Sequence, residues 1–340
     1  MTQMMPDALE SRTISITGDG RRLDVALSEA AGLTRSRVAA LMADGNVTVD
    51  GKVETKSGAK AKQGQIVILT IPAPKPAVPV AQEIPLTILY QDDDLAVVLK
   101  PCGMVVHPAA GNEDGTLVNA LLHHLDHLSG IGGELRPGIV HRIDKDTTGA
   151  VVVARHQIAA GKLWKAVTKR YVAVVSGVPQ PPEGLIDLPL EREIPLEMKR
   201  VVSPDGERAV TEYKVLATAP DESCALVGFI LHTGRTHQIR VHMAEKGWPL
   251  LGDELYGGPM EEFPRQALHC AGVAFTHPIT GEQLCLTAPL PEDMAALLKK
   301  KGIGWRPVLT PFVEELLTVQ PTTVEEITER YRKPKQKGRP

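Results

Sequence analysis

The sequence predicts an α+β protein of two domains, the larger of which is built on a mixed, largely antiparallel sheet. With 340 residues, the chain is too long for one ordinary hydrophobic core and long enough for two. A proline-rich stretch at 72–85, PAPKPAVPVAQEIP, favours an extended spacer and marks the domain boundary. Beyond it, short β-branched segments outnumber helical ones and rarely alternate with them, which argues against a doubly wound fold.

The composition is that of a globular protein, with 43% hydrophobic and 23% charged residues. No apolar run approaches the roughly 20 residues of a membrane span, and the first residues lack the pattern of a signal peptide. We therefore expect a cytoplasmic protein. The formal net charge of −3 means that any binding of nucleic acid depends on local basic patches. The four cysteines form no CxxC pair and are expected to be reduced thiols.

The small domain is expected at residues 18–71, preceded by a mobile leader at 1–17. The stretch VTVDGK alternates as a strand that runs into an Asp-Gly turn, and QIVILTI predicts a further strand. Two helices precede these strands, and Thr34 or Ser36 is placed to cap the second. Apolar residues recur at helical spacing in both helices, at Leu23, Ala26 and Leu27 and then at Val38, Leu41 and Met42.

Basic side chains are concentrated in this small domain. Eight basic and six acidic residues lie between Asp19 and Lys62. Such basic residues can contact phosphates, or they can form an ordinary solvated face. The stretch LTRSRVAALMADGNVTVDGKVETKSGAKAKQGQIV resembles an S4 domain, a small RNA-binding module. This resemblance implies that an RNA backbone is contacted by Arg35, Arg37, Lys52 and Lys56.

The large domain is expected at residues 86–300. Strands are predicted at LAVVLK, AVVVAR, YVAVVSG, VTEYKVLA, CALVGFIL and HCAGVAF, and helices at TLVNALLHHLDHL, RTHQIRVHMAEKG and PEDMAALLKKKG. His123, His124 and His127 lie in the first of these helices beside leucines. No Cys or Glu completes a ligand set there, so no metal site is predicted.

A C-terminal extension is expected at residues 301–340, ending in a basic tail. We expect the tail, RYRKPKQKGRP, to be disordered. It either adds sequence-independent attraction to RNA or is simply a solvated end. Its basic residues are Arg330, Arg332, Lys333, Lys335, Lys337 and Arg339.

The stretch 138–149, GIVHRIDKDTTG, places charged side chains at the mouth of an apolar strand. It lacks the glycines and the GKS or GKT ending of a phosphate loop, and the GxSxG pattern of a nucleophile elbow. Carboxylate chemistry therefore remains, with Asp144 as the candidate and Arg142 as a possible charge partner. An ionised, paired carboxylate is a base or a nucleophile. The alternative is a turn that happens to be polar.

A second polar cluster at 231–242, LHTGRTHQIRVH, holds two arginines and three histidines but no acidic residue. A buried arginine needs a carboxylate partner, and Asp144 is a natural candidate although it lies nearly a hundred residues away. The alternative is a solvated helical face. In a third segment, KRYVAVV, Tyr171 leads a strand, where it belongs either to the core or to a site that stacks on a base.

Five segments together resemble the RluA family of RNA pseudouridine synthases. They are KPCGMVVHPAAGNEDGTLVNALLHH, LSGIGGELRPGIVHRIDKDTTGAVVVAR, KRYVAVV, GRTHQIRVHMAEKGWPLLGDELYGG and ALHCAGVAFTHP, and they spread over most of residues 86–290. The nearest subgroup is the large-subunit ribosomal RNA synthase D type, which also has an N-terminal S4 domain. The resemblance implies isomerisation of flipped-out uridines in structured RNA, with 23S ribosomal RNA as the expected substrate, and without metal or organic cofactor. We expect the protein to be a monomer.

The resemblance also implies roles for individual residues. Asp144 would be the catalytic aspartate, Tyr171 would pack against the target base, and Arg240 would pair with Asp144. Arg142 would hold the flipped nucleotide or the gap that it leaves, and Leu268 would form an apolar wall of the uridine pocket. Residues expected to bind the substrate are Arg142, His141, Leu268 and Gln238.

Some positions depart from the family pattern. Thr148 and Ala150 stand where serine and leucine are commoner, and the stretch before Tyr171 is shorter and lacks a common phenylalanine. LPLEREIPLEMKRVV also looks trimmed. Two other classes of function stay open at this point: a non-catalytic RNA-binding or ribosome-assembly protein, and a metal-dependent hydrolase or nuclease that uses the His/Asp cluster.

Overall fold

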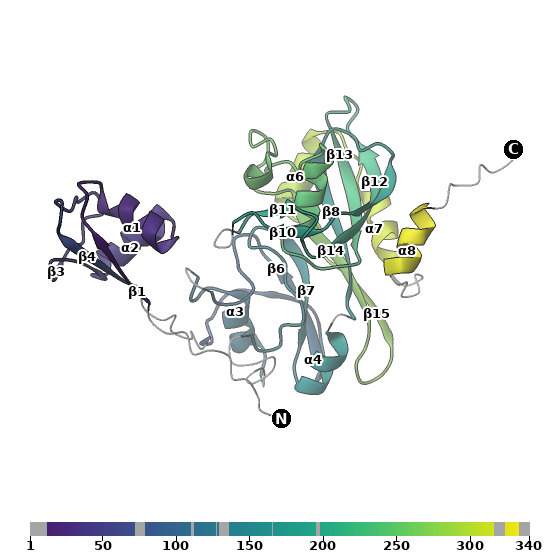
Figure 1. Ribbon diagram of the computed structural model, residues 1–340. Helices are drawn as coiled ribbons and strands as arrows, with labels where there is room; N and C mark the ends of the chain where they lie inside the picture. The colour runs from purple at the N-terminus through teal and green to yellow at the C-terminus, as the bar shows by residue number, and fades with distance from the viewer. Residues whose placement is uncertain are drawn as a thin grey trace, which may run out of the picture. The chain divides into compact units, whose positions relative to one another are not determined.

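The computed structural model describes residues 12–71, 79–109, 112–126, 128, 136–164, 166–194, 198–315 and 324–332. The chain forms two compact units, Met1–Pro76 and Ala77–Pro340, which are described separately below. Figure 1 labels their helices and strands. None of the helices in the described ranges has the length and apolar character needed to cross a membrane.

The small unit packs two helices against a four-stranded antiparallel sheet. The sheet has the order β1-β4-β2-β3. Its apolar core includes Leu27, Val38 and Leu69, and the Thr34 hydroxyl caps the second helix by accepting the Arg37 amide at 3.3 Å. The elements are β1 Arg12–Thr17, α1 Leu23–Ala31, α2 Arg35–Ala43, β2 Val47–Val49, β3 Lys52–Val53 and β4 Ile66–Ile71.

The prediction of a mobile leader at 1–17 is wrong for its last six residues. Arg12–Thr17 form strand β1, which pairs along its whole length with β4. Ile14 and Ile16 alternate with polar residues and pack against the apolar core of the small unit, so burial holds this strand in the sheet. Residues 1–11 lie outside the described part of the chain.

The large unit is built on a nine-stranded sheet that is antiparallel apart from the pairing of β7 with β14, which confirms the predicted mixed, largely antiparallel architecture. The strand order is β5-β6-β7-β14-β8-β13-β12-β9, with β15 beside β14. The strands are β5 Thr87–Gln91, β6 Leu95–Lys100, β7 Thr148–Ala154, β8 Thr168–Ser176, β9 Glu183–Asp187, β12 Val210–Thr218, β13 Cys224–Leu231, β14 Leu268–Thr276 and β15 Gln283–Thr287.

Helices cover both faces of this sheet, and a small ribbon lies beside it. Alternation along β8 directs Tyr171, Ala173 and Val175 into one apolar core and Val172 and Val174 into the other. The remaining elements are α3 Leu117–His124, α4 Gln157–Leu163, β10 Leu190–Arg192, β11 Arg200–Val202, α5 Gln238–Glu245, η1 Glu254–Tyr256, α6 Glu292–Lys300, α7 Arg306–Glu314 and α8 Val324–Arg332.

The expected boundary at residue 300 is too early, because α7 belongs to the core of the large unit. Phe312 and Val313 are buried in the second apolar core. A Cβ on Gly228 of β13 would lie 2.5 Å from the Phe312 ring, so the helix and the sheet approach closely only because this residue is glycine. The start of the basic tail is also ordered, since α8 continues to Arg332, and residues 333–340 lie outside the described ranges.

The described part of the proline-rich spacer, residues 79–85, forms no helix or strand, and it is not free. The Asn119 side chain donates to the Val80 carbonyl at 2.8 Å, and the Gln82 amide donates to the Asn119 carbonyl at 3.0 Å. Residues 79–85 are therefore fastened to the start of α3. Residues 72–78 lie outside the described part of the chain.

Candidate active site

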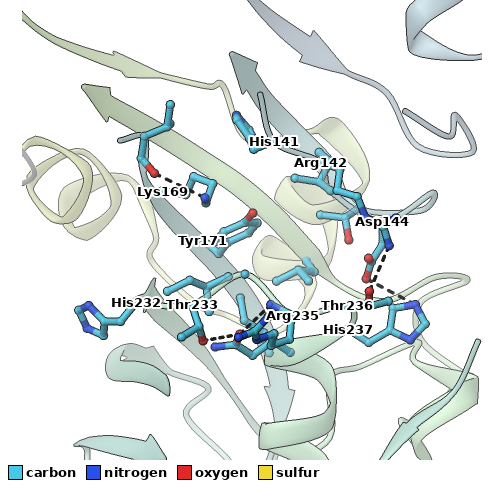
Figure 2. A pocket seen from close by; sticks show the side chains of 18 of the residues that line it. His141, Arg142, Asp144, Lys169, Tyr171, His232, Thr233, Arg235, Thr236 and His237 are labelled. Atoms are coloured by element: carbon cyan, nitrogen blue, oxygen red, sulfur yellow. Dashed lines mark hydrogen bonds and ion pairs between the residues drawn. The ribbon is translucent and has the colours of Figure 1, made fainter. Parts of the chain in front are cut away.

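A cavity of about 600 Å³ opens in the large unit where three polar segments meet. Its walls come from the loop before β7, the start of β8 and the loop that leads into α5 (Figure 2). The sheet order explains the meeting, because β14 lies between β7 and β8 and pairs Leu268 with Ala173, two residues from Tyr171. All three polar clusters predicted from the sequence thus contribute to one site.

The loop that carries Asp144 is fixed from beneath. Lys100, which is fully buried at the end of β6, donates to the Pro101, Met104 and Lys145 carbonyls at 2.7–2.8 Å. Burial lowers the pKa of Lys100 to about 8. The loop then enters β7 at Gly149, whose φ of 124° favours glycine. A Cβ at this position would also lie 2.3 Å from the Cys270 carbonyl oxygen of β14, so no other residue fits.

Arg265 fastens the same loop from the other side. Its guanidinium donates to the Asp146 carbonyl at 3.0 Å and forms two hydrogen bonds with Asp293 of α6, at 2.8 and 3.0 Å. The sequence reasoning missed both Lys100 and Arg265. The available signal was a lysine that ends an otherwise apolar strand, LAVVLK, because a buried lysine requires hydrogen-bond acceptors.

Asp144 lies at the cavity wall, with about a fifth of its side chain (19%) exposed. The Arg240 guanidinium donates to its Oδ2 at 3.3 Å, so the contact predicted between segments 96 residues apart is present. Arg142 does not pair with Asp144. It lies exposed at the rim and donates to the Thr236 hydroxyl at 3.2 Å, which links the two polar loops.

The closest partner of Arg240 is Asp253, which the sequence reasoning did not single out. The buried guanidinium forms two parallel hydrogen bonds with that fully buried carboxylate, at 2.7 and 2.8 Å. Burial opposes the charge on Arg240, but the hydrogen bonds that it donates to Asp253 prevail and raise its pKa. The Tyr256 ring covers the guanidinium, with a centroid distance of 5.0 Å. Arg240 therefore reaches Asp144 from a fixed position.

His237 is a third neighbour of Asp144. Its Nε2 lies 3.9 Å from the Asp144 Oδ2, and its Nδ1 lies 2.8 Å from the Tyr256 hydroxyl. That hydroxyl also accepts the Arg200 amide at 2.9 Å. Burial lowers the pKa of His237 to about 4, so the ring is neutral at neutral pH.

Tyr171 and Leu268 form the buried floor of the cavity. Both side chains are at most 5% exposed, and both line the cavity. Burial raises the pKa of the Tyr171 hydroxyl well above its ordinary value, so the ring is uncharged. An apolar floor with an aromatic face suits a flat nucleobase.

Gln238 and His141, both predicted to bind the substrate, form hydrogen bonds within the protein. The Gln238 amide is saturated within the protein: its oxygen accepts from Thr233 and Arg235, and its nitrogen donates to Val210 and Thr211. Gln238 therefore shapes the loop rather than offering free hydrogen-bonding groups to a ligand.

The His141 ring lines the cavity, but its Nε2 accepts the Val152 amide of β7 at 2.9 Å. Burial lowers the pKa of His141 well below its ordinary value, so the ring is neutral and Nδ1 carries the proton. That Nδ1 is buried and has no hydrogen-bond partner among the described residues. The geometry therefore gives His141 a part in holding the loop, and its contact with substrate stays a prediction.

In the small unit, the four residues expected to bind RNA are all exposed. Arg35, however, donates to Asp24 at 2.8 Å, and the hydrogen bonds from Arg22 and Arg35 hold the pKa of that carboxyl well below its usual range. Much of the Arg35 charge is thus neutralised within the unit.

One cluster with the composition of a metal site is present in the described parts of the large unit. Ligand atoms of Asp92, Asp94 and His277 lie within 4.8 Å of one another. His277 Nε2 lies 2.9 Å from the Asp92 carboxylate, which also accepts a hydrogen bond from the Tyr90 hydroxyl. None of the three residues of the cluster lines the cavity. The cluster therefore serves the fold of the β5–β6 turn.

The fold and the site together define a class of protein. It is an enzyme built on a mixed sheet, in which an arginine donates a hydrogen bond to a carboxylate at the wall of a cavity with an aromatic floor. A family model described as RNA pseudouridylate synthase matches residues 94–245, which include Asp144, Tyr171 and Arg240. An uncharacterized RNA pseudouridine synthase of Bacillus subtilis is 46% identical over 278 residues, which cover 79% of this chain and 91% of that protein. The chain belongs to the RNA pseudouridine synthases, a family of isomerases.

More specific names occur among the other similar proteins. A ribosomal large subunit pseudouridine synthase D of Zymomonas mobilis is 44% identical over 306 residues, which cover 84% of this chain and 96% of that protein. Among solved structures, human RNA pseudouridylate synthase domain containing 4 superposes with a TM-score of 0.51 at 27% identity, covering 64% of this chain and 94% of that one.

Proposed function

We propose that this protein converts uridine to pseudouridine in 23S ribosomal RNA, with Asp144 as the catalytic carboxylate. The observation that carries the assignment is the position of Asp144 at the cavity, 3.3 Å from an arginine that is itself held by Asp253. A fixed positive charge beside the carboxylate orients it. The choice of large-subunit ribosomal RNA rests on the name of the Zymomonas relative.

In this reaction the glycosidic bond moves from N1 to C5 of the base. Asp144 either attacks C1′ of the ribose or removes a proton from the sugar, and both steps require an ionised carboxylate. The exposed fifth of its side chain is the part available to a substrate. Because no atom is gained or lost overall, the isomerisation needs no external energy source.

The target uridine must leave its helical stack to reach this site. Asp144 lies at the wall of a cavity rather than on an open surface, and a stacked nucleotide cannot place its sugar there. Unstacking costs a few kcal/mol, which contacts to the RNA backbone can offset. In our proposal Tyr171 packs against the flipped base, Leu268 forms the adjoining wall, and Arg142 at the rim holds the nucleotide or fills its gap.

The small unit would supply part of this backbone contact as an S4-type RNA-binding domain. Its exposed Arg37, Lys52 and Lys56 form no ion pair with other described residues, whereas Arg35 shares its charge with Asp24. We therefore expect Arg37 and the two lysines to contribute more to phosphate binding than Arg35 does.

The assignment is tested with Asp144→Asn, which preserves the shape of the side chain and removes its charge. We expect it to bind 23S transcripts as the unchanged protein does and to release no tritium from 5-³H-uridine. Asp146→Asn, two residues away in the same loop, is the matched control and should retain activity. Tritium release by Asp144→Asn, or an unchanged pseudouridine map of ribosomal RNA from cells lacking the protein, would contradict the proposal.

A further inference from the structure

Lys169 is the cation in the cavity that the chemistry described so far does not use. Arg235 is paired with Glu207 at 2.8 Å, and Arg240 with two carboxylates. The Lys169 ammonium, by contrast, has one long contact of 3.5 Å to the Val167 carbonyl and forms no ion pair with a carboxylate among the described residues. The cationic side chains that line the cavity are Arg142, Lys169, Arg235 and Arg240.

The backbone directs Lys169 to the place where the base would lie. Lys169 precedes Tyr171 by two residues on β8, so both side chains leave the same face of the strand. Figure 2 shows them together on one side of the cavity, with Asp144 on the other. A base packed on Tyr171, with its sugar at Asp144, therefore has Lys169 near its edge.

A half-buried ammonium without a counter-ion among the described residues is unfavourable in the free protein. Burial lowers the pKa of Lys169, which reports this cost. A negative charge that forms inside the cavity would pair with this ammonium and offset the cost of its burial. Uracil is neutral in the substrate and becomes anionic when it leaves the sugar, so the free protein is complementary to the dissociating state rather than to the substrate.

We propose that Lys169 is a further catalytic residue, whose ammonium donates a hydrogen bond to a carbonyl oxygen of the departing uracil. When the C1′–N1 bond breaks, its electron pair passes to the ring and spreads over N1, O2 and O4. At the same time, Asp144 either bonds C1′ or takes a proton from C2′. The inference rests on the function proposed above, because it assigns the charge that this reaction generates.

The remaining steps balance without a proton from Lys169. C5 of the anion bonds C1′, which releases Asp144 from C1′ or returns its proton to C2′. The C5 proton then leaves and N1 gains one, which gives pseudouridine. Lys169 stays protonated throughout and acts through its charge and its hydrogen bond.

The test compares Lys169→Met in the full-length protein with Lys162→Met as a matched control. Lys162 lies seven residues earlier, its ammonium also donates to a single backbone carbonyl, that of Pro278, and it does not line the cavity. We expect Lys169→Met to lower the single-turnover rate on 5-³H-uridine 23S RNA by roughly 100- to 1,000-fold, as the loss of one transition-state donor does. The RNA dissociation constant should be nearly unchanged, and Lys162→Met should behave like the unchanged protein.

A second substrate separates catalysis from support of the fold. Fluorine at C5 stabilises the uracil anion by itself, so the rate loss of Lys169→Met should be several-fold smaller on 5-fluorouridine RNA than on uridine RNA. An equal loss on both substrates, or no loss on uridine, would overturn the role of Lys169. Lys169→Gln provides the same comparison if Lys169→Met does not fold. Inactivity of the unchanged protein would instead overturn the proposed function itself.

Discussion

The pair formed by Arg240 and Asp253 makes a quantitative prediction about how the site is supported. Asp253→Asn keeps the shape of the side chain but replaces one acceptor oxygen with an amide that faces the guanidinium. It removes the negative charge and one of the two charge-assisted hydrogen bonds, of 2.7 and 2.8 Å, between groups that are nearly completely buried. Breaking one partner of such a buried pair costs about 3–5 kcal/mol of the free energy of unfolding.

The loss also affects Asp144, because Arg240 is no longer held in place at its far side. A displacement of about 1 Å at a reacting group can cost roughly 100-fold in rate, so we expect turnover by Asp253→Asn to fall roughly 10- to 100-fold. Asp187→Asn is the matched control. Asp187 accepts two hydrogen bonds from Arg208 in the same bidentate way, but both side chains are at least 30% exposed, and we expect a cost of about 1 kcal/mol or less.

Urea unfolding followed by tryptophan fluorescence measures this difference in the large unit alone. All three tryptophans, at positions 164, 248 and 305, lie in that unit, so unfolding of the small unit does not contribute to the signal. The single-turnover rate is measured on the same preparations. If Asp253→Asn destabilises the unit no more than Asp187→Asn does, the buried pair is not the support that the geometry indicates.

Two further predictions concern pH and salt. Burial lowers the pKa of His242 and His269 to about 4, against 6.5 in an unfolded chain. Between pH 6.5 and about pH 4, unfolding therefore takes up protons. The urea midpoint should fall as the pH drops through this range. The difference in midpoint between about pH 7 and about pH 5 should be smaller for His242→Gln, and an equal difference would exclude this origin. Replacing Arg37 and Lys52 with Gln should reduce the slope of log affinity for RNA against log salt by about 1–2, because each phosphate contact releases a counterion. Arg21→Gln should leave that slope unchanged, since Asp19 and Glu29 already neutralise Arg21, and a comparable reduction by Arg21→Gln would argue against specific phosphate contacts.

Local patterns in the sequence were sufficient for much of the secondary structure. Alternation and helical spacing identified six of the nine strands of the large sheet and the helices α1 and α2. Strands β5, β9 and β15 were missed, and so was β1, although RTISIT alternates polar and apolar residues. The patterns also failed where the deciding contact is distant in the chain, since α7 was separated from the domain whose core holds its Phe312.

The same distinction applies to the site. The sequence by itself determined the composition of the reactive loop, GIVHRIDKDTTG, and the demand of a buried arginine for a carboxylate, which made Asp144 the candidate. The choice of Arg240 as its partner came from the family resemblance. It did not indicate Asp253 as the stronger partner, Lys100 and Arg265 as supports, or Lys169 as an unpaired charge. Those properties depend on burial and on distances between segments that the sheet order alone brings together. A charge becomes paired, strained or available only when the fold has removed water and chosen its neighbours.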